Sequence, residues 1–226
     1  MADEGATGAG TASDDFFEVV STARSVRRRL DFDRPVAPAL IERCIDAAVQ
    51  APTGLNREAW RFLVLTDPEP KRQVAELYRE SMAALTERLA GQLPDSMKGQ
   101  KLPSERPNYV GLAENIQRMP ALILVCSLGR PDPANTAMQV AFYGSVLPAA
   151  WSLMLALRAS GLGTTWTTLL VSEEERVAEA LGIPSDVTQT ILLPVAWTKG
   201  AVLRPADRKG AAEVTHWNRW DGSRPA

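Results

Sequence analysis

The chain has 226 residues, 45% of them hydrophobic and 23% charged, which is the composition of an ordinary soluble globular domain with a sizeable core. Its formal net charge is -2 and its isoelectric point is near 5.6, so a nucleic-acid partner is not expected, because nucleic-acid-binding domains are usually basic. The chain has one histidine and two cysteines, which are too few for a histidine-based metal site and argue against a Ser/His/Asp triad, so no metal is expected.

The chain begins with a small, acidic and glycine-rich segment, residues 1–12, which lacks the basic and apolar regions of a secretory signal. We expect this segment to be a disordered tail, the protein to be cytoplasmic, and one folded domain to extend over 13–226. Ser13, which is followed by two aspartates, predicts the N-cap and acidic first turn of a short helix that ends near Ala23.

A basic run follows this helix: the stretch ARSVRRRLDF places Arg24, Arg27, Arg28 and Arg29 within six positions. In a chain of nearly neutral charge, this run indicates a local anion site. Nucleic acid, a membrane surface, an acidic partner and a cofactor phosphate are the ligands to distinguish. If the stretch is extended, Arg24 and Arg28 share one face and Arg27 and Arg29 share the other. All four then cannot bind one ligand, and we expect Arg28 and Arg29 to be surface or ion-paired residues.

Periodic and apolar stretches predict the next elements. They are a helix within 36–52 that Pro52 ends, a strand at 61–66, a helix at about 70–90 and a buried strand at 121–128. Residues 91–111 are polar and rich in glycine and proline, which is typical of a functional lid or a disordered loop. We expect the lid region to cover about 81–110.

Residues 137–157 form the most apolar stretch of the chain and are long enough for a transmembrane helix. Gln139, Pro148 and the lack of a second span or a flanking basic cluster argue against that interpretation. A helix that is apolar on most faces is also what a buried central helix or a subunit interface requires. We therefore expect a buried interface helix and no membrane partner.

Gly161 and Gly163 predict a sharp turn into an extended segment after this helix. Ser172 and Glu175 have the spacing of a capping box and predict a helix N-terminus. Another buried strand is expected at 190–197.

The tail from residue 202 to 226 is polar but contains Trp217 and Trp220. Two tryptophans in a terminal segment favour docking on another surface, such as a second subunit.

Four of these stretches together resemble the FMN-dependent nitroreductase family, in the family's order and over about residues 14–221. They are ARSVRRRLDFDRPV, AAVQAPTGLNREAWRFLVL, LRASGLGTTWTTLL and RPADRKGAAEVTHWNRW. The resemblance implies an α+β fold, a nitroreductase-like mixed β-sheet flanked by helices. It also implies an intertwined homodimer in which a C-terminal arm, about 203–226, wraps the partner. Two FMN sites would lie at the dimer interface, each built from both chains.

The resemblance also implies which residues bind FMN. Arg24 and Ser25 would lie at the phosphate and ribityl end, and Arg27 would reach the pyrimidine edge of the ring. Arg208 would contact the phosphate, with Arg204 or Lys209 in its place if the register is shifted by a step. The remaining cofactor-binding residues are Pro52, Thr53, Gly54, Asn56, Thr165, Trp166, Thr167 and Thr168.

The chain departs from the family at Glu58, where the family's Gln-Pro pair is Glu-Ala. An acid in place of an amide is expected to alter local hydrogen bonds or the substrate preference, so Glu58 is a weak site candidate. Trp60 and Trp166 are each compatible with simple packing.

The activity that the resemblance implies is a ping-pong reduction. NADPH or NADH gives a hydride to flavin N5, and an electron-poor acceptor, such as a nitroaromatic or a quinone, then takes the electrons. No side chain is assigned as catalytic, because the flavin supplies the chemistry. Relatives of this fold that dehalogenate halotyrosines, cleave FMN or dehydrogenate cyclic dipeptides are the alternatives. A flavin-binding sensor or storage protein with little turnover is another.

Overall fold

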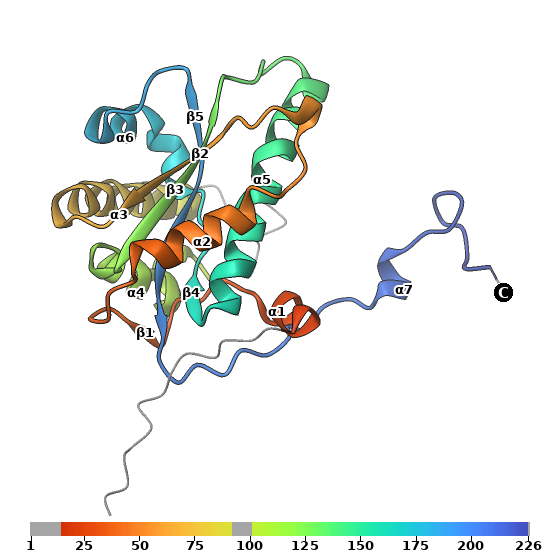
Figure 1. Cartoon of the computed structure of the whole chain (residues 1–226), viewed down its shortest axis with the longest axis horizontal. Helices are drawn as coiled ribbons and strands as arrows, with labels where there is room; N and C mark the ends of the chain where they lie inside the picture. The colour runs from red at the N-terminus through yellow and green to blue at the C-terminus, as the bar shows by residue number, and fades with distance from the viewer. Residues whose placement is uncertain (1–14, 92–100, 226) are drawn as a thin grey trace, which may run out of the picture.

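The computed structural model describes residues 15–91 and 101–225, and its centre is a β-sheet built on one long strand, β5 (Val187–Thr198) (Figure 1). Strand β3 (Ala121–Leu128) pairs with β5, and β2 (Trp60–Leu65) pairs with β3, both antiparallel. Two short strands, β1 (Leu30–Asp31) and β4 (Leu162–Thr164), pair antiparallel with the C-terminal end of β5. Parallel pairing occurs in isolated bridges.

Helices cover both faces of the sheet, so the predicted α+β fold is confirmed. One face packs on α2 (Pro38–Ala48) and α5 (Thr136–Ala159), and the other on α3 (Pro68–Gly91), α4 (Pro107–Asn115) and α6 (Glu174–Leu181). Because neighbouring side chains of a strand point to opposite faces, a strand covered on both sides is apolar along most of its length, although the start of β5 also buries Thr188, Gln189 and Thr190. This explains why the two central strands appear in the sequence as continuous apolar runs.

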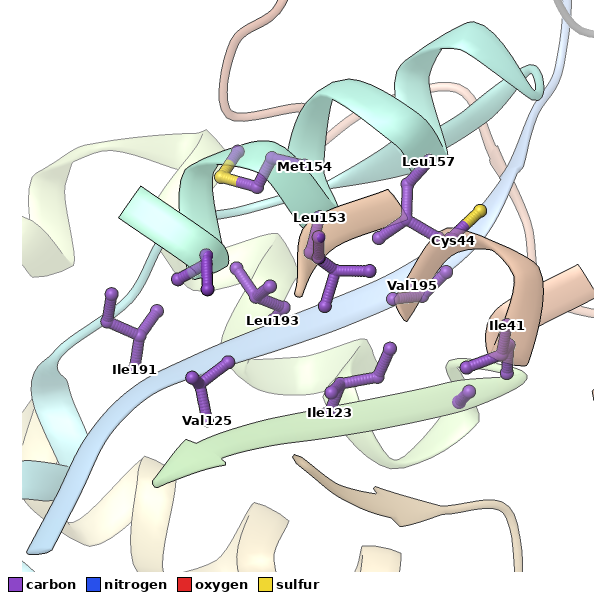
Figure 2. Close-up of a cluster of buried hydrophobic side chains, with 14 of the residues drawn as sticks. Ile41, Cys44, Ile123, Val125, Leu153, Met154, Leu157, Ile191, Leu193 and Val195 are labelled. Carbon is purple, nitrogen blue, oxygen red and sulfur yellow. The ribbon is translucent and has the colours of Figure 1, made fainter. Parts of the chain in front are cut away.

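The core between the sheet and α5 shows this arrangement (Figure 2). Ile123 and Val125 of β3 lie beside Ile191 and Leu193 of β5, and Leu153 of α5 packs against them. Residues of the opposite parity, such as Leu122 and Leu192, belong to the core on the other face. The sheet therefore has two cores, and its central strands contribute to both.

The apolar helix predicted at 137–157 is α5, and its burial differs between its two halves. Its C-terminal half is buried in the core, whereas Met138 and Val140 near its start are 55% and 67% exposed and Trp151 is 39% exposed. By length and composition α5 could cross a membrane, a test that the core helix of a soluble protein also passes. The burial of its C-terminal half confirms the core part of the prediction, and the interface role of its exposed residues stays a prediction. The cytoplasmic location stays a prediction.

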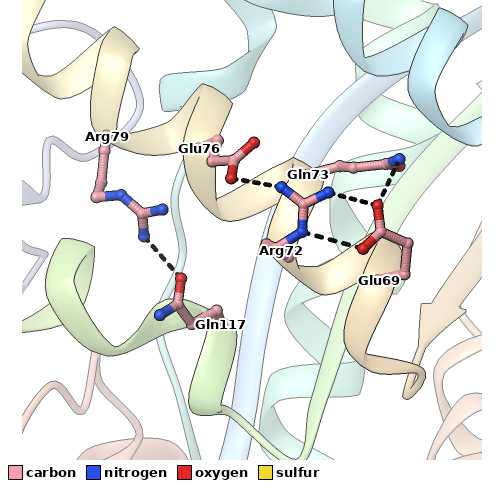
Figure 3. Close-up of polar contacts among 6 residues, drawn as sticks. All are labelled: Glu69, Arg72, Gln73, Glu76, Arg79 and Gln117. Atoms are coloured by element: carbon pink, nitrogen blue, oxygen red, sulfur yellow. Dashed lines mark hydrogen bonds and ion pairs between the residues drawn. The ribbon is translucent and has the colours of Figure 1, made fainter.

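The solvent-facing side of α3 is held by polar pairs (Figure 3). Arg72 lies between Glu69 and Glu76, one turn away on either side, and its hydrogen bonds lower the pKa of Glu69. Arg79 donates to Gln117 Oε1 over 3.0 Å and so ties α3 to the turn before β3. Exposed pairs of this kind stabilise a fold by ~0.2–1 kcal/mol each, so α3 is held chiefly by its buried face.

Three local predictions were wrong. The first helix is α1 (Phe16–Thr22), and its N-cap is Asp15, whose Oδ1 accepts from Glu18 N over 2.6 Å; Ser13 lies outside the described residues. Ser172 does not cap α6, because its hydroxyl donates to Leu169 O within a 3-10 turn, and α6 begins at Glu174.

The third wrong prediction concerns the loop at 91–111, since residues 107–111 belong to α4. The proline at position 107 begins this helix, where its missing N–H costs nothing. Within the predicted lid region, 81–91 is the last part of α3 and 103–105 is a 3-10 turn. The rest of that region, 92–100, lies outside the described residues, as does the predicted tail at 1–12. A lid role stays a prediction.

Candidate functional site

The arginine segment, residues 24–29, is fixed to the sheet by its main chain. Ser25 forms a parallel bridge with Thr164 at the end of β4, and Val26 N donates to Thr164 O over 2.8 Å. Thr165 Oγ1 donates in turn to Val26 O over 2.8 Å, and both groups are buried. The segment and the residues after β4 thus form one rigid unit, although they are far apart in the sequence.

Gly163 permits this close approach. A Cβ at this position would lie 2.9 Å from Leu30 Cδ2 and 3.2 Å from Val26 Cβ. Gly163 is therefore a packing glycine, whereas the predicted turn is made by Gly161, whose φ is +83°. Any side chain at Gly163 would push the arginine segment away from β4.

The predicted flavin segment, residues 165–168, continues from β4 directly beside the arginines. Trp166 N donates to Ser25 Oγ over 3.3 Å, so the serine hydroxyl accepts here and its proton can still be donated to a ligand. Thr167 exchanges two backbone hydrogen bonds with Leu192 of β5. Trp166 is half-buried against the core, which agrees with a packing role.

A cavity of about 540 Å³ opens beside this unit. Its lining residues are Arg24, Ser25, Val26, Arg27, Arg28, Arg29, Asn108, Ala201, Val202, Leu203 and Arg204. All four arginines of the run face this one cavity, contrary to the two-face arrangement expected of an extended stretch. The run is not extended along its whole length, since residues 28 and 29 form a bend. Arg29 has a φ of +54°, and its Nη1 donates to Gly200 O over 2.8 Å. Arg28 and Arg29 are exposed, in agreement with the predicted surface role.

Two of the arginines carry a buried donor that the protein does not use. The Nε atoms of Arg24 and Arg27 are buried and have no hydrogen-bond partner within 15–91 and 101–225. A buried charged donor without a partner destabilises a fold by ~1–3 kcal/mol or more. Such a pair at a cavity fits an anionic ligand with several oxygens, and the phosphate and ring oxygens of FMN have this chemistry.

A second group of predicted residues lies elsewhere in the chain. The loop with Pro52, Thr53, Gly54 and Asn56 is held at α5, where Gly54 N donates to Ser145 Oγ over 3.0 Å. Its 3-10 turn, Gly54–Asn56, exposes it to solvent, and Leu55 is 93% exposed.

The arginine segment lies at the other end of α5. There Arg158 donates to Thr22 Oγ1 over 3.2 Å and pairs with Glu18, two residues of α1. Ser145 and Arg158 are thirteen positions apart in one helix, a rise of about 20 Å. One chain therefore does not bring the Asn56 loop to the cavity.

Arg208 is also separate from the cavity. Its Nη1 donates to the adjacent Asp207 O over 3.2 Å, and the arm that carries it leaves the body of the protein (Figure 1). Arg204, the neighbour considered for a shifted register, is the residue of this motif that lines the cavity. Glu58 is exposed and its carbonyl accepts from Arg61, whereas Trp60 is buried in the core.

Comparison with known proteins identifies this arrangement. The model of the Nitroreductase family matches residues 20–197, which is most of the chain. The protein belongs to the nitroreductase family.

This nitroreductase-family chain is 32% identical to iodotyrosine deiodinase 1 of Rattus norvegicus over 206 residues, which cover 89% of this chain and 69% of that protein. It is 26% identical to the iodotyrosine deiodinase of Thermotoga neapolitana over 174 residues, 77% of this chain and 84% of that one. The fold is similar to the crystal structure of an oxidized iodotyrosine deiodinase bound to FMN and 3-iodo-L-tyrosine. That comparison gives a TM-score of 0.68 and 20% identity, and it covers 90% of this chain and 98% of that one. A BluB-like flavoprotein from Clostridium difficile 630 gives a TM-score of 0.68 at 17% identity, over 92% of this chain and all of that one.

Two residues of α4, Asn108 and Tyr109, were missed by sequence reasoning. Asn108 lines the cavity, and the ring of Tyr109 lies 4.6 Å from the Cζ of Arg27. The stretch around them was interpreted as loop because of its prolines. The signal that could have found the helix is Pro107 as its first residue.

Proposed function

We propose that this protein is an FMN-dependent oxidoreductase that takes electrons from NADPH or NADH and passes them to an electron-poor small molecule, such as a nitroaromatic or a quinone. The observation that carries the proposal is the pair of buried, unpartnered Nε atoms at a cavity beside residues 165–168. Family membership supports it, because the donors fit the cofactor of the FMN-bound relative.

When bound, FMN would supply the redox chemistry: it can accept a hydride from the nucleotide and pass the electrons to the acceptor. The chain's own residues bind and orient it. Arg24 and Ser25 offer charge-assisted and neutral hydrogen bonds to phosphate and ribityl oxygens. By the family resemblance Arg27 would face the pyrimidine edge of the bound ring, where its permanent positive charge would favour the negatively charged reduced form. The backbone of Thr165–Thr168 is fixed by β4 and β5, so its N–H groups are preorganised.

The first test is an absorbance spectrum of the purified protein with and without added FMN, followed by anaerobic addition of NADPH or NADH. We expect flavin bands that bleach on addition of one of the nucleotides and return with a nitroaromatic or a quinone. Bands that bleach without turnover on any acceptor would favour a sensor or storage role. A protein that takes up no FMN would refute the proposal.

We further propose that the working unit is a homodimer in which the Asn56 loop of one chain completes the cavity of the other. The separation of about 20 Å along α5 is the reason, together with the exposed apolar residues of that helix. Mixing the Arg24→Ala and Asn56→Ala variants, at an FMN concentration that leaves each of them alone largely without cofactor and inactive, tests this directly. A mixed dimer would contain one site with both changes and one intact site, so activity should return. No recovery after subunit exchange would contradict the shared site.

A second candidate, reductive dehalogenation of a halotyrosine, is favoured by the relatives, which are iodotyrosine deiodinases at 26–32% identity. In that reaction the aromatic carbon–halogen bond breaks, a carbon–hydrogen bond forms, and two electrons and one proton are consumed as halide leaves. The FMN-loaded protein should be incubated anaerobically with excess dithionite and 3-iodotyrosine, and tyrosine measured by chromatography. Tyrosine in proportion to enzyme would favour this activity. Its absence, with nitroaromatic reduction present, would favour the first.

A further inference from the structure

The guanidinium of Arg27 has an aromatic partner that the sequence did not suggest. Its Cζ lies 4.6 Å from the centroid of the Tyr109 ring, within the range of a cation–π contact. Tyr109 is half-buried on α4 and packs against the core on that face of the sheet. Arg106, the N-cap of α4, has its Cζ 5.7 Å from the same ring. The ring is therefore held by the fold on one side and faces the cavity arginine on the other.

A second tyrosine links the same place to the predicted flavin segment. Tyr78 of α3 is buried, and its hydroxyl lies 3.4 Å from Thr167 Oγ1. Burial raises the pKa of Tyr78, while the charge of Arg27 lowers it and Tyr109 raises it. Tyr78 and Tyr109 belong to the same hydrophobic core on this face of the sheet, which connects the Arg27–Tyr109 contact with the Tyr78–Thr167 contact.

The aromatic contact differs from an ion pair in what it leaves to a ligand. Within 15–91 and 101–225 no carboxylate forms an ion pair with Arg27, and its Nε has no hydrogen-bond partner. A ring face attracts a cation without neutralising it and without using its N–H groups. The guanidinium is held in place while its charge and its donors stay available.

We propose that Tyr109 is a positioning residue for the flavin, because its ring holds the guanidinium of Arg27 at the cavity. Arg27 is then already ordered before FMN binds, and its side chain loses little further conformational freedom on binding. This inference rests on the proposed function, because it assigns Tyr109 a role toward the same ligand. The contact also makes flavin affinity depend on α4, a helix outside the motifs that resemble the family. Preorganisation of this kind strengthens binding by removing the cost of immobilising a long side chain.

The first measurement is the dissociation constant of FMN, from quenching of its fluorescence, in a double-mutant cycle of the full chain. Tyr109→Leu should weaken FMN binding by about 3- to 30-fold, the range of one cation–π contact. Tyr109→Phe keeps a ring and should stay within about threefold of the parent. In an Arg27→Met background the Leu change should have little effect on FMN binding, because the cavity arginine that the ring contacts is gone and Arg106, the other cation near the ring, does not line the cavity. Equal effects of Tyr109→Leu in both backgrounds would show simple packing and overturn the inference.

The second measurement uses variants in which Tyr109 is replaced by phenylalanine carrying an increasing number of ring fluorines, and it determines their FMN affinity. Each fluorine weakens the negative face of the ring at nearly constant shape. The FMN dissociation constant should rise steadily along the series, and the reduction potential of the bound flavin should fall as Arg27 loosens. A flat series would overturn the inference, and this holds even if the Leu variant does not fold.

The parent protein distinguishes the two proposals. If it takes up no FMN, the proposed function fails and the role of Tyr109 falls with it. If it binds FMN while the fluorinated series is flat and the double-mutant cycle is additive, the proposed function stands and the role of Tyr109 alone is refuted.

Discussion

The arginine segment and the C-terminal arm both contain basic residues that the family resemblance assigns to the phosphate, but the fold treats them differently. Residues 24–27 are hydrogen-bonded to β4 and the segment after it, and they line a cavity. The arm, 203–226, is described to residue 225 and extends away from the sheet (Figure 1). One chain is sufficient to build the first region and is not sufficient to bury the second.

The arm nevertheless has order of its own. Gly210 N donates to Glu213 Oε1 over 2.8 Å at the start of α7 (Ala211–Val214). The rings of His216 and Trp220 stack at 4.4 Å, and Trp220 is 80% exposed. Local hydrogen bonds and ring contacts determine these features, whereas burial of a tryptophan requires another surface. Contacts within one chain thus order the arginine segment, whereas we propose that the arm needs a partner subunit to bury its tryptophans.

Deletion of residues 203–226 should have the largest effect, because it removes the proposed dimer arm together with Leu203 and Arg204, which line the cavity within one chain. We expect the dimer to dissociate at micromolar concentration and FMN binding to weaken by more than about 100-fold, since both depend on the same arm. Light scattering after size exclusion and an FMN titration measure the two effects. Deletion of 223–226 alone is the matched control and should change neither. A stable dimer that still binds FMN after the long deletion would show that the arm is dispensable.

Arg24→Ala should have the next largest effect, within the region that one chain builds. Loss of one charge-assisted hydrogen bond costs about 1.5–3 kcal/mol, or roughly 10- to 150-fold in the FMN dissociation constant. The dimer should persist, because the apolar surface of α5 is unchanged. Arg28→Ala, an exposed residue of the same cavity, is the control and should stay within about threefold. If the two variants bind FMN equally well, the hypothesis that an arginine with a buried, unpartnered Nε binds the cofactor is wrong.

The fold was predictable where its sequence signal is strong and local. The run Ala121–Leu128 matches β3 at both ends, and the apolar stretch at 137–157 lies within α5. A continuous apolar run is typical of both a strand and a helix buried on all sides, and length distinguishes the two: eight residues favour a strand and about twenty favour a helix. Capping residues were less reliable, because Asp15 and Ser13 have nearly equal propensity for the N-cap position.

The site was predictable only in part, for a physical reason. The motifs named Arg24, Ser25 and Arg27, and the fold brings them beside Thr165 through β4. Tyr109 could not be found in this way, because its contact with Arg27 depends on how α4 packs on the sheet. No local sequence pattern encodes a contact between residues that are 82 positions apart.

Arg208→Ala tests the arm through one side chain and should weaken FMN binding by about tenfold, less than the deletion, because the rest of the arm stays. Arg204→Ala and Lys209→Ala are the comparisons. Arg204 lines the cavity in a single chain, whereas Arg208 is expected to reach a phosphate only in the assembled protein. A larger effect at Arg204 than at Arg208 would show that the motif is shifted and that the region built by one chain already contains its phosphate ligand.

Ser145→Ala should have the smallest effect, because it loosens the Asn56 loop without removing a ligand-binding group. Ser145 Oγ accepts from Gly54 N and donates to Ala141 O over 2.7 Å, so the change leaves one loop amide without its partner. A neutral hydrogen bond contributes about 0.5–1.5 kcal/mol, which corresponds to roughly 2- to 12-fold in the FMN dissociation constant if the loop must be ordered to bind.

Ser152→Ala on the same helix is the control for Ser145→Ala, since no hydrogen bond of its side chain is found within 15–91 and 101–225, and its FMN affinity should equal that of the parent. The effect of Ser145→Ala should also depend on protein concentration, because we propose that the loop completes the cavity of the partner subunit. The FMN affinity of this variant should therefore be measured in concentrated protein and in protein dilute enough for the dimer to dissociate. If the mutation weakens FMN binding equally in both samples, the loop acts on the cavity of its own chain. The separation along α5 argues against that outcome, and the boundary between the two regions would then have to be redrawn.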